Sequence, residues 1–216
     1  MITSYKELSI KKYQEIREIL AEDGGELTVQ ARIIACLNDW DEDTVLNLSL
    51  TKYNELAQGT AFLMEKPKLD GKIPNKLNIK GQEYIITTDV RKLTTGQYID
   101  YQTLCAQKDQ EKYLANILAC FIVPKGCTYG TGYDVDEITA WISENLSIQD
   151  AMNICFFFRK KYLNSIRYMA TYLGLQMKIL KKRAKTVEAR EMMEKLDQRL
   201  KALQKILQDA GDGLAW

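Results

Sequence analysis

The chain has 216 residues, with 30 lysines and arginines, 29 aspartates and glutamates, and no histidine. This composition is typical of a folded globular protein and excludes a disordered, collagen-like or disulfide-scaffold chain. The missing histidine excludes Ser-His-Asp and Cys-His catalysis within one chain, together with C2H2 fingers and HExxH metal sites. We find no signature of another catalytic set, so the sequence predicts no enzyme activity, bound metal or cofactor.

The remaining composition favours an intracellular setting. The cysteines are odd in number and no two have CxxC spacing, so we expect reduced, mostly buried thiols at positions 36, 105, 120, 127 and 155. The chain starts without a basic region followed by an apolar one. Its longest apolar run, Ile117 to Val123, is far shorter than the roughly 18–20 residues that cross a bilayer. The sequence therefore predicts a cytosolic protein without a membrane partner.

The small net charge of +1 conceals a strong asymmetry along the chain. Residues 1–64 contain six basic and eleven acidic side chains, whereas residues 151–187 contain nine basic side chains and no acidic one. The remaining segments are close to neutral. An acidic N-terminal third and a basic C-terminal segment thus coexist in one chain.

Four helix starts share one sequence pattern, in which leucine precedes Ser9, Ser49, Thr94 or Ser147. Serine and threonine cap helices by accepting a hydrogen bond from a free backbone N–H, and the preceding leucine forms a hydrophobic staple. The forty-residue offset between the first two copies could also mark a helical repeat, but repeated capping explains all four. In the N-terminal third the sequence predicts helices near residues 10–21, 28–38, 42–47 and 50–63.

The middle of the chain contains the predicted β structure. Residues 65–76 hold two of the three prolines and no helical period, which indicates a linker. Alternating apolar residues around a turn at Lys80-Gly81 predict a β-hairpin over 77–86, which must pack on helices or on a partner's sheet edge. Helices are expected near 95–106, 109–122 and 135–144.

A long helix near 148–184 is predicted next, since its apolar residues step by three and four to form one stripe. This stripe comprises Phe158, Tyr162, Ile166, Met169, Leu173, Met177, Leu180 and Ala184. A second segment has coiled-coil spacing at Met193, Leu196, Leu200, Leu203 and Leu207. A break near Lys185-Thr186 would give an antiparallel helical hairpin, which we favour over one continuous rod.

These elements define a mainly helical α+β fold in four parts. We expect an N-terminal helical region over 1–64, a linker over 65–76, a β-hairpin with helices over 77–146, and a long helical hairpin or coiled coil over 147–216.

Two local patterns resemble ligand sites but lack required residues. The glycine-rich loop 125–132 matches neither GxxxxGK[ST] nor GxGxxG, so we interpret it as a connection. Asp39, Asp41 and Asp43 alternate like an EF-hand start, yet Thr44 and Leu50 stand where that loop needs glycine and glutamate. We interpret these acids as a helix N-terminus.

Three groups of residues are candidates for partner binding. Phe156, Phe157 and Phe158 cover more than one helix face, which fits either the centre of the core or a subunit interface. The heptad residues Met193, Leu196, Leu200, Leu203 and Leu207 predict association within the chain or with a partner. The basic residues favour an acidic surface over nucleic acid, which stays the alternative; they are Arg159, Lys160, Lys161, Arg167, Lys178, Lys181, Lys182, Arg183 and Lys185.

Residues 77–165 resemble proteins of tailed bacteriophages. The matching stretches are Ile79 to Tyr84, Leu93 to Asp100, Pro124 to Gly126 with Tyr129, Gly132 to Asp134, and Phe156 to Lys160. A small hairpin followed by "LTxGQ" at a helix start is similar to tail assembly chaperones, and the wider pattern resembles virion-gene products of crAss-like phages. The resemblance implies no catalytic residues.

The expected function is therefore a non-enzymatic role in phage particle assembly through protein–protein contacts. A virion component would dock on neck, portal or tail proteins, or be packaged as internal cargo, whereas a chaperone would hold a tail protein and then leave. Expected partners are other phage structural proteins or a further copy of the chain, in the virion or in the host cytoplasm during assembly.

Overall fold

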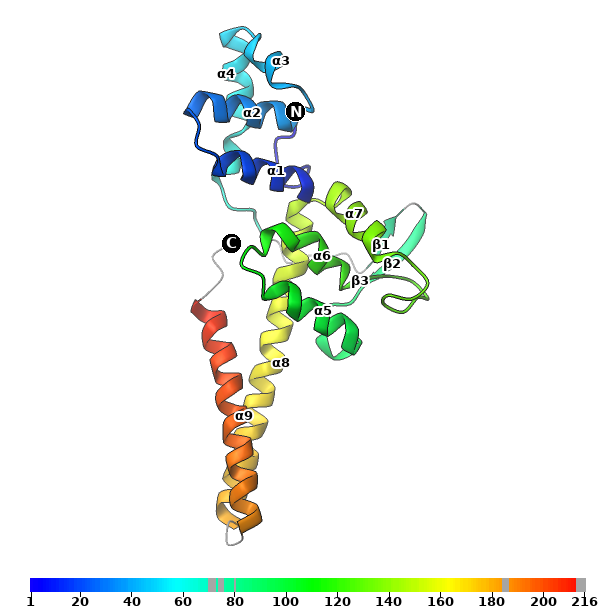
Figure 1. The fold of residues 1–216 in the computed structure, drawn as a ribbon, viewed down its shortest axis with the longest axis vertical. Helices are drawn as coiled ribbons and strands as arrows, with labels where there is room; N and C mark the ends of the chain where they lie inside the picture. Colours follow the sequence, from blue (N-terminus) through cyan, green and yellow to red (C-terminus); the bar gives the residue numbers. More distant parts are fainter. Residues whose placement is uncertain (70–72, 74–75, 80, 184–186, 213–216) are drawn as a thin grey trace. The chain divides into compact units, whose positions relative to one another are not determined.

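The computed structural model describes residues 1–69, 73, 76–79, 81–183 and 187–212. It confirms a mainly helical fold with a small antiparallel sheet and a C-terminal helical pair. The chain divides into two compact units, Met1–Phe157 and Phe158–Trp216. Figure 1 shows the elements in chain order. The helices of the first unit are α1 (Ile10–Ala21), α2 (Glu26–Asn38), α3 (Glu42–Leu46), α4 (Leu50–Gly59), α5 (Thr95–Cys105), α6 (Leu114–Ala119) and α7 (Val135–Asn145), with 3-10 turns at Ala61–Met64, Val90–Lys92 and Glu111–Tyr113.

The predicted helix caps are present. The hydroxyl oxygens of Ser9 and Ser49 accept hydrogen bonds from backbone N–H groups three residues on, and Ser147 accepts one from Asp150. Thr94 forms a full capping box with Gln97. Asp41 caps α3 in the same way, which confirms the interpretation of this acid as part of a helix N-terminus.

Two of these caps face one another. Ser9 and Ser147 form an antiparallel bridge, in which the N–H of Ile148 donates to the carbonyl of Leu8 at 2.8 Å. The N–H of Ile10 donates to the carbonyl of Leu146 at 3.2 Å. The starts of α1 and of α8 (Ile148–Arg183) are therefore fixed to each other, although the two serines lie 138 positions apart in the sequence.

The sheet has three antiparallel strands in the order β1 (Lys76–Ile79), β2 (Gln82–Ile86) and β3 (Ile122–Pro124). The expected hairpin is β1–β2, and Gly81 adopts the positive φ of +83° that its turn requires. The predicted helix over 109–122 was wrong at both ends. A 3-10 turn precedes α6, and the apolar residues after Ala119 leave the helix to pair with β2, with Ile122 opposite Ile86.

One core holds the first unit together. Tyr84 and Ile86 on β2 are buried with side chains from α1, α2, α6, α7 and the start of α8. The sheet thus packs on helices, as an isolated hairpin could not remain stable alone. A second cluster joins α2, α3 and α4 through Ile34, Val45 and Leu56.

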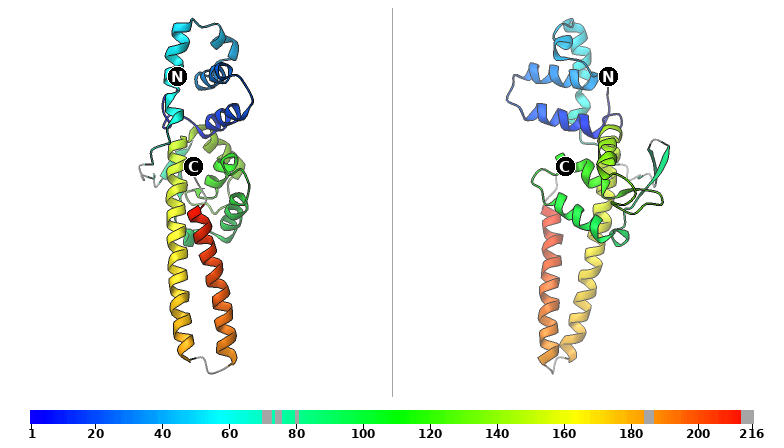
Figure 2. Two further views of the ribbon diagram at one scale, coloured as in Figure 1. Left: turned by 90° about the vertical axis from the view of Figure 1, so that its left-hand side faces the viewer. Right: turned by 45° about the vertical axis from the view of Figure 1, so that its right-hand side comes forward.

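Helix α8 (Ile148–Arg183) begins in the first unit and continues through the second, where α9 (Val187–Asp212) follows it. The two helices of the second unit lie side by side and run in opposite directions, as Figures 1 and 2 show from several sides. This confirms the antiparallel helical hairpin. The break expected near Lys185-Thr186 lies outside the described residues, as do Ala184 and residues 70–72, 74 and 75 of the predicted linker.

Candidate functional site

Helix α8 exposes a line of large apolar side chains in the second unit. They are Tyr168, Tyr172, Leu175 and Ile179, with exposed fractions of 81%, 59%, 53% and 47%. Their spacing of four, three and four residues places them on one face of the helix, because an α-helix turns about 100° per residue. We call these four residues the α8 apolar stripe.

A different face of α8 carries the stripe predicted from sequence. Phe158 and Ile166 in it are buried, and Tyr162, Leu173, Met177 and Leu180 are half-buried, whereas Met169 is exposed. This face lies about 120° around the helix from the α8 apolar stripe. The helix is therefore apolar on two sides, and only one of them is well covered.

The predicted heptad residues of α9 are all half-buried. They are Met193, Leu196, Leu200, Leu203 and Leu207. Because α9 lies beside α8 and this row has coiled-coil spacing, we assign the row to the seam of the helical pair. A seam of two helices leaves each helix with faces that another chain could cover.

The phenylalanine triplet lies where α8 passes from one unit to the next. Phe158 is buried, Phe157 is partly buried, and Phe156 exposes 48% of its surface. Three consecutive helical residues point in directions about 100° apart, which explains the different degrees of burial.

Basic side chains follow one edge of the α8 apolar stripe. Lys160, Arg167 and Lys178 are exposed and lie about 90–110° around the helix from the centre of the stripe, on the side away from the α8–α9 seam, with Lys160 about two turns before Tyr168. Lys161 continues the line of the stripe toward the N-terminus of α8. Lys181 is exposed and Arg159 is half-buried. The side chains of Lys182 and Arg183, and the whole of Lys185, lie outside the described residues.

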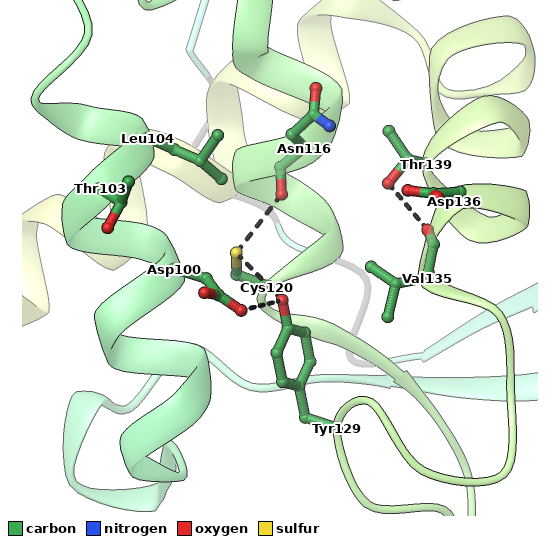
Figure 3. Close-up of a pocket in the computed structure, with 9 residues that line it drawn as sticks. All are labelled: Asp100, Thr103, Leu104, Asn116, Cys120, Tyr129, Val135, Asp136 and Thr139. Carbon is green, nitrogen blue, oxygen red and sulfur yellow. Dashed lines mark hydrogen bonds between the residues drawn. The ribbon is translucent and has the colours of Figure 1, made fainter.

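The first unit contains a shallow pocket of about 220 Å³ between α5, α6, the loop 125–132 and α7 (Figure 3). Tyr129 from the loop donates a hydrogen bond from Oη to Asp100 Oδ2 on α5, at 3.0 Å. Its Oη also lies 3.8 Å from Cys120 Sγ, and that thiol lies 3.4 Å from the carbonyl oxygen of Asn116. The other lining residues are Thr103, Leu104, Val135, Asp136 and Thr139.

The pocket groups are poorly suited to acid–base or nucleophilic chemistry. Burial raises the pKa of the Cys120 thiol to about 11, so the reactive thiolate is scarce near neutral pH. Burial, with the nearby Cys120 and Asp100, also raises the pKa of Tyr129. The hydrogen bonds instead hold the loop 125–132 against α5 and α6, and this is the role we assign to them.

The described residues contain no group of three or more acidic or cysteine side chains arranged to hold a metal ion. Asp41 caps α3 at its N-terminus, as predicted. The prediction was wrong for Asp39, which ends α2 in the left-handed conformation and pairs with Lys12 at 2.7 Å. Among the helices as far as they are described, none combines the length and apolarity needed to cross a bilayer.

Comparison with known proteins gives no match. No family model, no curated protein and no solved structure is similar to this chain at a significant level.

The α8 apolar stripe was not recognised from the sequence, although its signal was present. Tyr168, Tyr172, Leu175 and Ile179 repeat at helical spacing just as the predicted stripe does. Two apolar stripes on one helix call for two covering surfaces, and spacing alone does not say which stripe the chain itself covers.

Proposed function

We propose that this is a non-enzymatic protein that works by binding other protein chains through the α8 apolar stripe. The observation that carries this proposal is the exposure of four large apolar side chains in one line on α8. At about 200 Å² for each fully exposed side chain of this size, their exposed fractions amount to about 500 Å² of mostly apolar surface. Single patches of this size on a monomer often mark interaction sites.

The residue types of the stripe also fit a binding surface. Two of its four members are tyrosines, which combine a large apolar ring with a hydroxyl that can stay hydrated. Tyrosine and arginine are enriched among residues that dominate binding energy, and Arg167 lies beside the stripe. A partner helix that covered the stripe would therefore gain both apolar and polar contacts.

We place this activity in the assembly of a bacteriophage particle. The support is the resemblance of residues 77–165 to proteins of tailed phages. Within that setting we favour a virion component that contacts neck, portal or tail proteins, because an exposed apolar stripe on a long helical pair suits a fixed position in a particle. A tail assembly chaperone that leaves before maturation is the alternative.

The experiment is quantitative mass spectrometry of density-purified particles and of the whole lysate from the source system. A fixed multiple-copy signal in particles supports the virion component, and abundance in the lysate with none in particles supports the chaperone. The variant Tyr172→Asp/Leu175→Asp is expected to lose incorporation. A matched control, Gln198→Asp/Gln204→Asp, changes two exposed residues of α9 and is expected to retain it.

Nucleic-acid binding is a second candidate, favoured by the charge of α8. Residues 158–183 include eight basic and no acidic side chains, and Lys160, Lys178 and Lys181 are exposed. Binding to a phosphate backbone would weaken steeply with salt. Retention of duplex DNA at low salt that is lost in Lys160→Glu/Lys178→Glu supports this candidate, and equal retention by both proteins contradicts it.

A further inference from the structure

The first unit carries a surface whose charge is opposite to that of α8. Residues 22–55, which include α2, α3 and the start of α4, contain eight acidic and only two basic side chains. Both basic side chains are already paired with acids of the same segment, Arg32 with Glu22 and Lys52 with Glu55. We call the three helices α2, α3 and α4 the acidic lobe.

The acidic lobe also exposes large apolar side chains. Leu46 at the end of α3 and Leu50 at the start of α4 have exposed fractions of 61% and 75%, and Trp40 just before α3 is also exposed. Asp43 and Asp41 lie within five residues of Leu46, and both are exposed. Three consecutive acids, residues 41–43, therefore lie in the sequence between the exposed Trp40 and the exposed Leu46.

From these two surfaces we infer that the chain assembles with itself head to tail, the α8 apolar stripe of one copy binding the acidic lobe of the next. This inference rests on the proposed function, since it names the occupant of the stripe. On α8, Arg167 and Lys178 lie on the face next to the apolar residues and Lys160 lies about two turns before them, and on the lobe Asp43 lies three residues before Leu46. The two surfaces thus match both in apolar character and in charge.

The positive charge of α8 also favours a contact between unlike surfaces over a symmetric one. A symmetric dimer that paired α8 with α8 would bring together two segments with eight basic and no acidic side chains each. Like charges face each other unfavourably in such an interface. A contact between unlike surfaces avoids this repulsion, and repeated contacts of that kind form a ring if they close and a filament if they do not.

The area available is sufficient for a specific but moderate contact. The stripe offers about 500 Å² of exposed side-chain surface, and a standard interface covers roughly 800 Å² on each partner. The flanking lysine and arginine stems would supply much of the remainder. The contact is therefore expected to depend on concentration and on ionic strength.

The test is a charge exchange measured by light scattering after gel filtration and by analytical ultracentrifugation of the full chain. One variant, Lys160→Glu/Lys178→Glu, reverses the charge of two exposed basic residues of α8. The other, Glu42→Lys/Asp43→Lys, reverses the charge of two acidic residues of the acidic lobe. The control, Arg190→Glu/Lys205→Glu, makes the same change in net charge as the first variant at two exposed positions on α9. Circular dichroism confirms folding, and the single substitution Asp43→Lys replaces the lobe variant if the double substitution unfolds.

The wild type and the control are expected to gain mass with concentration up to about 100 µM, and to lose association at least about tenfold in high salt. Each reversed variant alone is expected to stay monomeric. Mixing the two reversed variants is expected to restore assembly, because each then presents the charge that the other needs. A chain with all four substitutions is also expected to assemble.

Three results would overturn the inference: a monomeric wild type, a dimer that the lobe variant does not disturb, or a mixture that stays monomeric. These results leave the proposed function in place if the wild type still enters particles and Tyr172→Asp/Leu175→Asp does not. If Tyr172→Asp/Leu175→Asp enters particles as well as the wild type does, by contrast, the proposed function is contradicted, whatever the oligomeric state of the isolated chain.

Discussion

The buried side chain of Gln97 offers a sharp test of how the first unit is held together. It is 4% exposed at the start of α5, and its Oε1 accepts a hydrogen bond from the backbone N–H of Thr94 at 2.8 Å. Its Nε2 donates to the carbonyl oxygen of Cys120 at 2.9 Å. One amide therefore completes a helix cap and joins α5 to the end of α6.

The substitution Gln97→Glu separates these two roles. A carboxylate can still accept from the N–H of Thr94, so the capping box survives. It cannot donate to the carbonyl of Cys120, and it places a negative oxygen against that carbonyl in a buried position. Loss of a buried hydrogen bond costs about 1–3 kcal/mol, and burial of the charge adds to this cost. We expect the free energy of unfolding to fall by about 2–4 kcal/mol at pH 8.

The loss is expected to depend on pH with a definite sign. Burial and the facing carbonyl would raise the folded-state pKa of the new carboxyl above its unfolded value. The stability of the variant is then greater at low pH, where the protonated carboxyl can donate to Cys120, and is lost as pH rises through the raised pKa.

The assay is urea unfolding followed by tryptophan fluorescence, since Trp141 on α7 packs against the core of the first unit. The control, Gln107→Glu, changes an exposed glutamine that also donates to a backbone carbonyl, and is expected to alter stability by less than about 0.5 kcal/mol. Equal stability of the Gln97 variant and the wild type at pH 8 would refute the reasoning. So would a deficit that does not shrink at pH 5.

Three further predictions concern other parts of the chain. Gly174→Ala is expected to stabilise the second unit by about 0.5–1 kcal/mol in thermal unfolding, because a Cβ there meets no atom within 4 Å and glycine is a poor helix former; a lower Tm would show that position 174 needs glycine. Leu200→Asp is expected to lower the free energy of unfolding by about 2–3 kcal/mol and to reduce the helical signal in circular dichroism, since this half-buried residue lies in the α8–α9 seam. Unchanged helicity would place the seam between chains instead. Cys120, with its raised pKa of about 11, is expected to react with iodoacetamide at pH 8 about 100-fold more slowly in the folded chain than in urea. For the same reason the free energy of unfolding is expected to fall as pH rises from about 9 toward 11. Similar alkylation rates in both states would exclude the raised pKa.

Much of the secondary structure followed from local sequence signals. Ser9, Ser49, Thr94 and Ser147 each satisfy a backbone N–H within their own helix, so the capping pattern could be recognised without knowing the fold. The spacing of apolar residues likewise predicted both long C-terminal helices.

The third strand could not be predicted in the same way. Ile122 to Pro124 is only three residues long, and it forms because β2, about forty residues earlier, offers a free edge. The apolar run from Ile117 to Val123 fits a buried helix or a buried strand equally well by composition. Non-local pairing decided where the helix ended.

The α8 apolar stripe was not identified from the sequence for a related reason. In α8 the covered row that includes Phe158 and Ile166 and the exposed row that includes Tyr168 and Leu175 have the same residue types and the same spacing. Only the exposed fractions in the folded structure show which row is covered. The basic character of residues 151–187, by contrast, was visible in the charge count alone.

Site-specific photocrosslinking shows whether another protein chain covers the α8 apolar stripe. A photoreactive phenylalanine analogue at Tyr172 is irradiated in cells or particles of the source system, with the same analogue at the exposed Gln198 of α9 as the control. We expect a discrete protein adduct from position 172 that disappears in Leu175→Asp, and no such adduct from position 198. No adduct at 172, or the same diffuse pattern from both positions, would contradict it.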